Sequence, residues 1–564
     1  MKLYKLFIAG GVMAASMSLS SCVGDLDLEP TSPNDITVGT FEQDPEMYMR
    51  QVFADIFLQC STYGVNGSNT LSSMDGGMST FQRAIFNMEE IPTDEADWLP
   101  QSDVIPWNWQ FGILTSTDAP VMGTYSRMMV ISTLCNQFIQ EDFKLKTPEQ
   151  EALREEFVRQ VKIIRSAMYF YLVSEYGNVP MNDENVIVGT IAPQLSTDFA
   201  TGRRLVTENV VNTLEEIVAW YKENDPNNQP PYGYVGLDVA ESLLVKFYLN
   251  YEVFTGTPAW DKCYQHAVAV INRMQGQGFV ASDGVATGLA MNYFQNFSYN
   301  NRDQHEIIWR IVSQNADTNK EMTGVDAGVL SYANGGFMIM AWIGGDLQTT
   351  YNAGNGWKCM VARTQLVEAF EDWDASWGTC PDYRTNWWQT SVNGRNRLNP
   401  SMTLDTWDET GYLPVKYVNW YIEDDGRVNS GMSPTSGSST DPTCIDYGMI
   451  RLAEIYLSAA EAALNGAASN DIALKYVNYI RERAQLEPWS TVNLTTMRQE
   501  RQRELYTECV RRTDLIRYGQ WISGYNWNWK YGVADGTDYP SNMNVYPLPA
   551  TVVQLNGYTQ NPGW

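Results

Sequence analysis

The feature that most constrains the fold of this chain is an apolar spacing of three and four residues that recurs in several separate blocks. It is clearest in residues 149–176, which Gly177 and Pro180 follow. This spacing gathers apolar side chains on one face of an α-helix, and a glycine with a nearby proline ends the helix. The same argument predicts helices over residues 238–254, 260–274 and 450–464, and a further helix that opens at Asn470 and Asp471.

These blocks form pairs of helices joined by short turns. Such helix–turn–helix pairs are the unit of tetratricopeptide-like arrays, in which each pair buries its apolar face against the next. Here the pairs are scattered along the chain and do not recur at a fixed period. We therefore expect a mainly α-helical fold with a scaffold of tetratricopeptide-like helix pairs. Its segments lie near residues 41–60, 120–275 and 445–520.

Two long segments, near residues 61–115 and 315–442, interrupt the expected scaffold. They are rich in Gly, Ser, Asn, Asp and Trp and show no sustained helical period. Loops of this length are uncommon in a compact protein and usually serve a function. The chain of 564 residues also exceeds the roughly 250–300 residues at which one core usually stops growing. We expect a loop-rich second lobe that carries the ligand site.

The N-terminus is typical of an exported, lipid-anchored protein. Lys2 and Lys5 precede a short apolar stretch, and Leu19-Ser-Ser-Cys22 follows it, which resembles the lipobox of bacterial lipoproteins. The apolar stretch is too short to span a bilayer, which takes about 20 residues. We predict a signal peptide over 1–21, lipidation of Cys22 and a flexible acidic tether over 22–40. The folded domain then covers 41–564, and the lipid is its only attachment to the membrane.

The charge and the scarcity of histidine exclude several classes of function. The formal net charge is −28, which argues against nucleic acid as a partner because phosphates need a basic patch. The chain has only two histidines and lacks the P-loop and dinucleotide fingerprints, so catalytic triads and nucleotide cofactors are not expected. We expect a protein that is not an enzyme and needs no cofactor. A structural calcium ion near Asp424-Asp425 stays open.

Cysteine usage points away from a disulfide framework. Besides Cys22 there are seven cysteines at wide spacings, and no CxxC pair occurs. An odd number at such spacings favours buried free thiols over bridges or a zinc site. The sequence leaves open whether Cys359 and Cys380 pair.

Three stretches of the chain resemble a known family. They are the helix that ends in Tyr176-Gly-Asn-Val-Pro180, the segment 447–461 with Ile480-Arg-Glu-Arg-Ala484, and the Glu- and Arg-rich segment 500–519. Together with the lipobox they resemble the SusD/RagB family of nutrient-binding outer-membrane lipoproteins, in order along nearly the whole chain. One departure is Cys509, where the family usually has glycine.

The resemblance implies a function as well as a fold. Members of the family bind glycans at the cell surface, in loops beside the helical scaffold, and do not cleave them. It implies a partner, a SusC-like TonB-dependent barrel transporter, and a place on the outer membrane facing the cell exterior. The sequence names neither the glycan nor its linkage or chain length.

The Glu- and Arg-rich segment itself is not predicted to bind ligand. Glu500 and Arg503, and likewise Glu508 and Arg512, are spaced so that opposite charges fall one turn apart on a helix. We expect these charges to brace a helix.

Candidate ligand residues come from both loop-rich segments. A sugar ring offers an apolar face and a rim of hydroxyls, so its recognition needs flat aromatic rings with polar groups beside them. Trp527 and Trp529 could form a surface ridge, but we expect them to anchor the last loop. The candidates are Asp94, Trp98, Trp107, Asn108 and Trp109 from the first segment, and Tyr332, Trp342 and Trp357 from the second.

The same residues are also compatible with a purely structural role and with two further functions. The tryptophans could pack the junction between loops and helices without touching ligand. A minority of the family handles peptides. A peptide would be recognised through its main chain, with little dependence on these tryptophans. A surface glycosidase would need two carboxylates roughly 5–9.5 Å apart, for which Asp94 with Glu95 or Asp97 is a formal candidate. Glycan binding is our leading hypothesis, ahead of peptide binding and then of glycosidase activity.

Overall fold

The computed structural model describes residues 44–61, 78, 80–313, 334–342, 350–353, 356–357, 359–370, 380–392, 395–396, 412–434 and 445–564. The expected signal peptide, Cys22 and the expected tether lie outside these residues, as does Tyr332. The predicted mainly α-helical fold is confirmed. None of the helices within the described ranges is long and apolar enough to cross a membrane.

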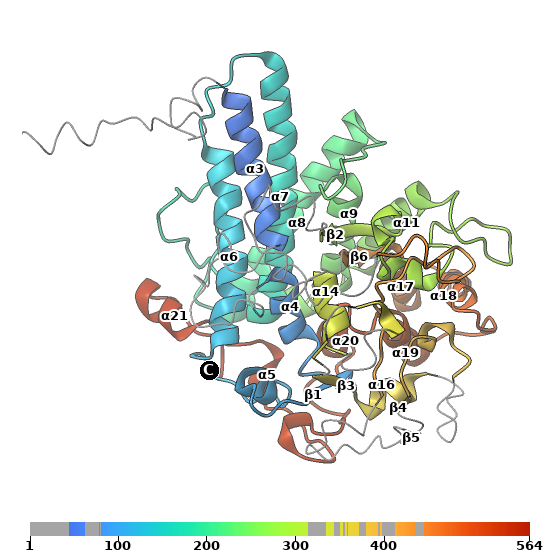
Figure 1. Cartoon of the computed structure of the whole chain (residues 1–564). Helices are drawn as coiled ribbons and strands as arrows, with labels where there is room; N and C mark the ends of the chain where they lie inside the picture. Colours follow the sequence, from blue (N-terminus) through green and yellow to red (C-terminus); the bar gives the residue numbers. More distant parts are fainter. Residues whose placement is uncertain are drawn as a thin grey trace, which may run out of the picture.

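Three long helices stand side by side at one end of the molecule (Figure 1). They are α3 (Pro45–Ser61), α6 (Ala119–Gln140) and α7 (Pro148–Tyr176). The expected stop of α7 is observed. Gly177 follows the helix with a φ of +69°, a conformation that residues other than glycine disfavour.

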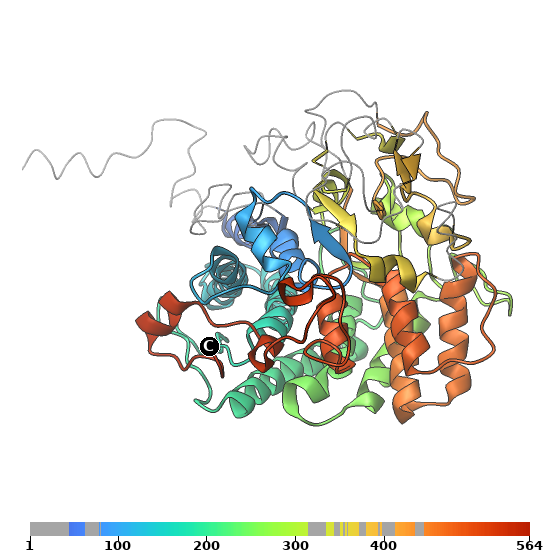
Figure 2. The same ribbon diagram turned by 90° about the horizontal axis from the view of Figure 1, so that it is seen from below.

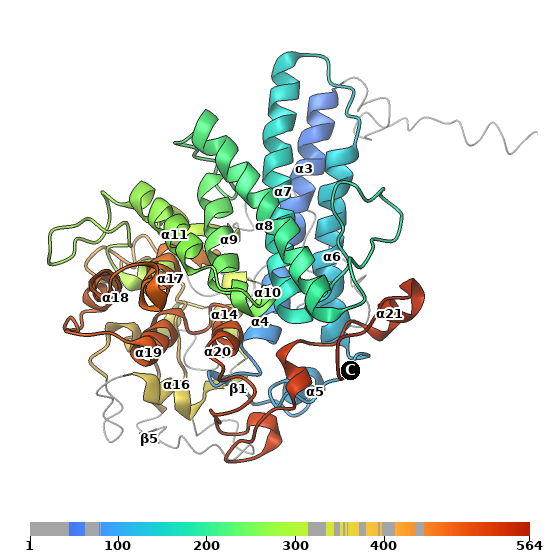
Figure 3. The same cartoon turned by 180° about the vertical axis from the view of Figure 1, so that it is seen from behind.

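From α7 the chain builds a curved array in which each helix packs against the next (Figure 3). This array is the helix-pair scaffold predicted from the apolar spacing, and residues 445–520 return to complete it. Its further members are α8 (Phe199–Asn224), α9 (Leu237–Leu249), α11 (Trp260–Met274), α17 (Leu452–Ala462) and α18 (Asn470–Arg483).

Two predicted helix boundaries differ from the structure. The helix expected over 238–254 is broken at Asn250, whose side-chain amide donates to the carbonyl of Lys246 at 2.9 Å, and α10 (Tyr251–Thr255) continues beyond it. The helix expected to start at Ile450 begins at Leu452, because Tyr447–Arg451 forms strand β6 and pairs with β2 (Ile307–Ile311). Short apolar runs do not reveal by their period whether they form strand or helix.

The first expected loop segment contains a helix that the sequence did not predict. α4 (Phe81–Glu89) is buried along its whole length, including its polar residues, and contacts both α3 and α6. Its apolar residues Phe81, Ile85 and Met88 do follow a helical spacing, but nine residues are fewer than the roughly 11–18 over which such a period is read.

The remaining elements are short and surround the array. β1 (Ala96–Trp98) pairs with β3 (Met360–Ala362), and β4 (Ser391–Val392) with β5 (Arg395–Asn396). The other helices are α5 (Val104–Trp109), α14 (Asn334–Met340), α16 (Thr364–Ala369), α19 (Leu494–Leu505), α20 (Arg511–Arg517) and α21 (Ala550–Asn556). Single helical turns are η2 (Tyr293–Phe297), η3 (Asn301–Asp303), η4 (Tyr383–Thr385), η5 (Ala463–Ala467), η6 (Lys530–Gly532) and η7 (Ser541–Asn544).

A buried network of ion pairs joins these elements. The guanidinium of Arg451 donates to Glu306 and Glu508 at 2.6 Å each and to Glu504 at 3.2 Å, and all four side chains are almost fully buried. Such a network stabilises a fold only when every member is paired, because an unpaired charge in the core is very costly. It continues through Arg384, Lys416, Arg481 and Arg483.

The network keeps its carboxylates ionised to low pH. Burial opposes ionisation of Glu306, but Arg483 and Arg451 hold the pKa of Glu306 at about 2, against an ordinary value of 4.5. Arg384 and Arg503 have the same effect on Glu500, whose pKa is also about 2 in spite of burial. Since both pKa values are lowered by folding, their stabilisation is complete above pH 4.5 and is lost as the pH falls through about 2.

One of the two charge pairs predicted for the last helices is wrong. Glu500 and Arg503 do pair one turn apart on α19, at 2.8 Å. Glu508 and Arg512 do not, because α19 ends at Leu505 and Glu508 turns inward to the Arg451 network, while Arg512 faces α4. The charges therefore tie distant segments together in the core.

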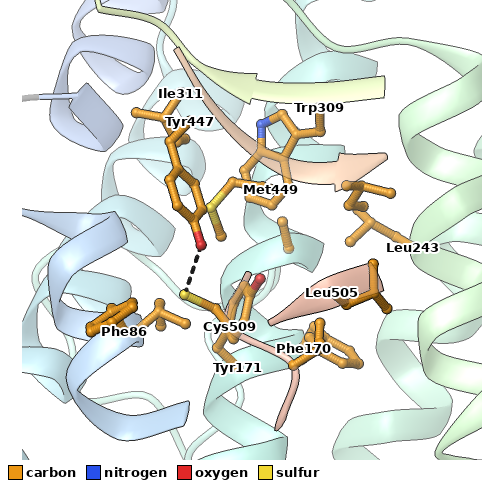
Figure 4. Packing of buried hydrophobic residues seen from close by; sticks show 14 of the residues in the cluster. Phe86, Phe170, Tyr171, Leu243, Trp309, Ile311, Tyr447, Met449, Leu505 and Cys509 are labelled. Carbon is orange, nitrogen blue, oxygen red and sulfur yellow. Dashed lines mark hydrogen bonds between the residues drawn. The ribbon is translucent and has the colours of Figure 1, made fainter. Parts of the chain in front are cut away.

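Cys509 occupies a backbone position that favours glycine. Its φ is +60°, in the left-handed region, and its thiol lies 3.2 Å from the hydroxyl of Tyr447 (Figure 4). The surrounding core takes side chains from α4, α7, α9, β2 and β6, as Figure 4 shows. A thiol here fills space that glycine would leave empty, at the cost of a strained backbone.

We predict that Arg451→Met destabilises the protein by about 3 kcal/mol or more, because it leaves Glu306 and Glu508 each short of a buried partner. Denaturant unfolding monitored by circular dichroism measures the effect. The matched control is Arg427→Ala, which removes an arginine that pairs with Asp425 at the surface and should leave the midpoint unchanged. Equal midpoints for the two variants would show that the buried network contributes nothing to stability.

Candidate ligand-binding site

A two-stranded ribbon brings the two loop-rich segments together. β1 pairs antiparallel with β3, with Trp98 opposite Met360, and the N–H of Leu99 donates to the carbonyl of Cys359 at 2.8 Å. Figure 2 shows the two strands side by side, blue next to yellow, with the red C-terminal segment beside them. Candidate residues that lie far apart in the sequence therefore share one region.

Trp98 lies in the core, with 4% of its surface exposed. Gln110 binds its backbone on the side away from β3: the side-chain oxygen accepts from the Trp98 N–H at 2.8 Å and the amide donates to the Trp98 carbonyl at 3.0 Å. The guanidinium of Arg83 lies 5.0 Å over the indole ring. Trp98 offers a sugar no ring face in this structure, and packing at the junction of loop and helices explains it better.

Trp109 and Trp342 are buried in the same way, at 2% and 0% exposure. The ring of Trp109 packs against Tyr546 with centroids 5.3 Å apart. Trp342 directly follows Ala341, whose carbonyl accepts the N–H of Met360 at 3.0 Å and so holds this segment along β3. Both tryptophans are therefore core residues in this structure.

Asp94 is buried in an ion pair. Its carboxylate accepts from Arg511 at 2.7 and 2.6 Å and from the hydroxyl of Tyr525 at 2.7 Å. Burial alone would raise the pKa of Asp94, but Arg511 and Tyr525 hold that pKa below its usual value. Asp97 is buried too and pairs with Arg363 at 2.9 Å. The carboxylates named as a formal glycosidase pair therefore lie in the core and not at a surface.

Three of the candidates do lie at the surface, on segments that flank the ribbon. On α5, Trp107 is half-buried and Asn108 is exposed, while Trp357 is 38% exposed. Trp357 stands three residues before Met360 of β3, and α5 starts six residues after Trp98 of β1, so both segments lead away from the same end of the ribbon. Two tryptophans and an amide therefore lie at the surface on segments that the β1–β3 ribbon connects.

Arg363 fixes this region to the C-terminal segment. It follows β3 and is buried, and it donates to the carbonyl of Ala96 at 3.1 Å, to that of Gln110 at 3.3 Å and to that of Asn528. Gln365 adds a bond to the side chain of Asn528 at 2.8 Å. One guanidinium therefore places β1, the end of α5 and the last loop against each other.

The last loop carries aromatic residues that our candidates did not include. Trp527 anchors it as expected, fully buried and stacked on Trp521 at 5.7 Å. Trp529 is half-buried instead, and Tyr531, which the sequence did not single out, is 41% exposed. The signal that could have found them is the run Asn-Trp-Asn-Trp-Lys-Tyr-Gly, in which aromatic residues alternate with turn-forming residues without a helical period.

Two buried glutamates face each other beneath the ribbon. Glu90 and Glu95 are in hydrogen-bonding contact, and Glu95 also accepts the N–H of Thr507 at 2.9 Å. Burial raises the pKa of Glu95 from 4.5 to about 7, although Arg511 partly offsets it. The pKa of Glu90 is raised as well, by burial and by Glu95. The pair therefore holds a proton at mildly acidic pH.

The structure also locates the residues considered for calcium and for a disulfide. Asp425 pairs with Arg427 at the surface and Asp424 accepts from Gln295, and no group of three or more His, Cys, Asp or Glu that could hold a metal occurs among the residues described. Cys359 and Cys380 are both free thiols.

Comparisons with known proteins agree with the resemblance seen in the sequence. The model of the SusD family matches residues 305–564. The starch-binding protein SusD of Bacteroides thetaiotaomicron is 27% identical over an aligned length of 613, gaps included. The alignment covers 99% of this chain and 98% of SusD.

Solved structures show the same fold. Surface glycan-binding protein A from Bacteroides thetaiotaomicron, in complex with laminarihexaose, matches with a TM-score of 0.60 and 18% identity over 91% of this chain and 99% of that one. A laminarin-binding SusD-like protein matches with a TM-score of 0.63 and 19% identity over 92% of this chain and 99% of that one. At such identities the likeness establishes the fold alone.

We predict that Asp94→Asn lowers stability by about 3 kcal/mol, because Arg511 then lacks its charged partner in the core. Asn108→Ala, at an exposed position of the same region, should leave the unfolding midpoint unchanged. Denaturant unfolding of both variants makes the comparison. If Asp94→Asn unfolds like the unmodified protein and only loses ligand, the carboxylate is a ligand residue after all.

We also predict that Glu95→Gln makes stability less dependent on pH. Because the pKa of Glu95 is raised by folding, the unmodified protein loses stability as the pH rises from 4.5 to about 7, where only the unfolded chain releases the proton. The variant should therefore gain thermal stability relative to it at pH 8 more than at pH 5. Glu46→Gln on α3 serves as the surface control. Parallel curves of melting temperature against pH would contradict the prediction.

Proposed function

This chain belongs to the SusD/RagB family, and we propose that it is a non-catalytic cell-surface protein that binds oligosaccharides or polysaccharides. Support comes from the relatives: one is named a starch-binding protein, and a neighbour in fold was solved with laminarihexaose. The bound glycan would pass to a SusC-like TonB-dependent transporter, the partner that the family implies.

The observation that carries the proposal is the surface position of Trp107, Asn108 and Trp357, on segments that flank the β1–β3 ribbon. Two indole rings at the surface can each cover the apolar face of a sugar, and a large rigid ring loses little conformational entropy on binding. The exposed amide of Asn108 can donate to and accept from hydroxyls at the rim of the sugar. The contact residues of the ligand are thus proposed to be these three.

Anchoring at the membrane belongs to the same proposal. Cleavage of residues 1–21 would leave Cys22 as a lipidated N-terminus, and residues 22–40 would separate the folded domain from the outer membrane. Several acyl chains hold a protein firmly, since each buried CH₂ contributes about 0.8 kcal/mol. A tethered domain on the outer face could then swing over its transporter.

We predict that at least one polysaccharide retards the protein in native affinity electrophoresis and is not shortened on long incubation. The chain starts at residue 22 and carries Cys22→Ser, so that no lipid is added. Trp357→Ala and Trp107→Ala should each weaken retardation by about fivefold to tenfold in Kd, which corresponds to roughly 1–1.4 kcal/mol of lost ring contact.

The control is Trp220→Ala, which removes a tryptophan of similar exposure, 37%, on the helical array. It should bind like the unmodified protein. Release of reducing sugar would favour the glycosidase. Binding of peptides with retardation by no polysaccharide would favour the peptide-binding alternative.

A further inference from the structure

The aromatic surface continues beyond the proposed contact residues. The ring of Trp107 meets Phe111 edge-on with centroids 5.4 Å apart, and Phe111 lies 6.5 Å from Trp529. Tyr531 follows two residues later in the same loop. We refer to Trp107, Phe111, Trp529 and Tyr531 as the aromatic ridge. It leads from α5 onto the C-terminal loop.

Exposed apolar side chains flank the ridge on both segments. Val104 is 61% exposed, Ile113 53%, Val533 46% and Tyr531 itself 41%. The segment after α5 and the C-terminal loop lie against each other. A Cβ atom added to Gly532 would be 3.9 Å from Cδ1 of Ile113. An exposed apolar area of this kind, built from two segments, marks an interaction site more often than a scatter of single residues does.

The loop is strained where it presents the ridge. Trp529 and Tyr531 have φ values of +66° and +55°, in the left-handed region that residues other than glycine disfavour. The buried Lys530 between them donates to the carbonyls of Ile522 at 3.2 Å and Tyr525 at 2.9 Å and so enforces the turn. Strain of this kind persists where the surrounding structure over-determines it, often at ligand sites.

The charges around the ridge indicate which ligands it accepts. Residues 99–118 contain no lysine or arginine, and residues 519–549 contain only Lys530, which is buried. Asp103, Asp535 and Asp538 are exposed in the same two segments. Carboxylates accept hydrogen bonds from neutral hydroxyls but repel sulfate and uronate groups.

We propose that the aromatic ridge is an additional stacking platform, through which the site binds neutral oligosaccharides several sugars long. The inference rests on the proposed glycan-binding function and extends it in one direction, from Trp107 to Trp529 and Tyr531. A short ligand engages Trp357 and Trp107 alone. A longer one continues onto Trp529 and Tyr531 of the C-terminal loop, beneath which the buried Phe111 packs between Trp107 and Trp529. Arg363 and Gln365 hold this loop in register with α5 through Asn528.

The test measures affinity against ligand length by isothermal titration calorimetry. The probes are oligosaccharides of three and of six sugars from starch, laminarin and mannan, with heparin and polygalacturonate as acidic polymers. Tyr531→Ala and Trp529→Ala should weaken binding of the six-sugar ligand about tenfold, which corresponds to about 1.4 kcal/mol, and leave the three-sugar ligand unchanged. Tyr531→Phe keeps the ring and should bind like the unmodified protein, as should Trp220→Ala.

The aromatic ridge and the proposed glycan binding can fail independently. Glycan binding that is unchanged in Tyr531→Ala and Trp529→Ala at both lengths, in variants with normal melting temperatures, overturns the platform and leaves glycan binding intact. Equal losses for short and long ligands also overturn it, since the ridge would then belong to the first contact. Tighter binding of heparin or polygalacturonate rejects the selection for neutral sugars. Failure of every probe to bind rejects both proposals.

Discussion

The buried guanidinium of Arg451 is the interaction on which the rest of the structure depends. It stands at the end of β6, where α17 begins, and reaches Glu306 before β2 as well as Glu504 and Glu508 around the end of α19. Segments that lie far apart in the sequence therefore meet at one charge. An ion left without partners in the core costs several kcal/mol, so the network permits only the arrangement in which all partners arrive together. The network therefore fixes how the helices of the array align with each other, more than it adds net stability.

The same principle positions the candidate site. Arg363 binds backbone carbonyls of β1, of the residue after α5 and of the C-terminal loop, and Arg511 ties Asp94 to α20. Buried arginines suit this task because the planar group donates in several fixed directions at once. The surface tryptophans of α5 and of the last loop are thus carried on parts of the chain that the core already holds rigidly. A binding site preorganised in this way loses less entropy when a ligand arrives.

The sequence predicted the scaffold far better than the site. Helix α11 has its predicted bounds and α7 ends at its predicted glycine, because a repeated apolar spacing is a local property that survives in any context. Ile450 formed a strand because Trp309 lies opposite it, which no local pattern shows. Trp98 and Trp107 lie in one loop-rich segment of uniform composition, yet one is buried and the other reaches the surface. Trp98 is held in the core by Gln110 and Arg83, whereas Trp107 packs edge-on against Phe111 near the surface. Such contacts exist only after the chain has folded.

The distribution of charge connects the core to the choice of ligand. The chain has 66 acidic and 38 basic residues, and the buried arginines and lysines of the core are largely matched by buried carboxylates such as Glu306, Glu500 and Asp514. Because the buried basic and acidic side chains balance each other, the excess of carboxylates lies outside the core. An acidic surface repels anionic polymers over roughly a Debye length, about 8 Å at physiological salt, but exerts little force on a neutral sugar. Recognition of neutral sugars must then come from ring faces and hydroxyl partners, and those are what α5 and the C-terminal loop present.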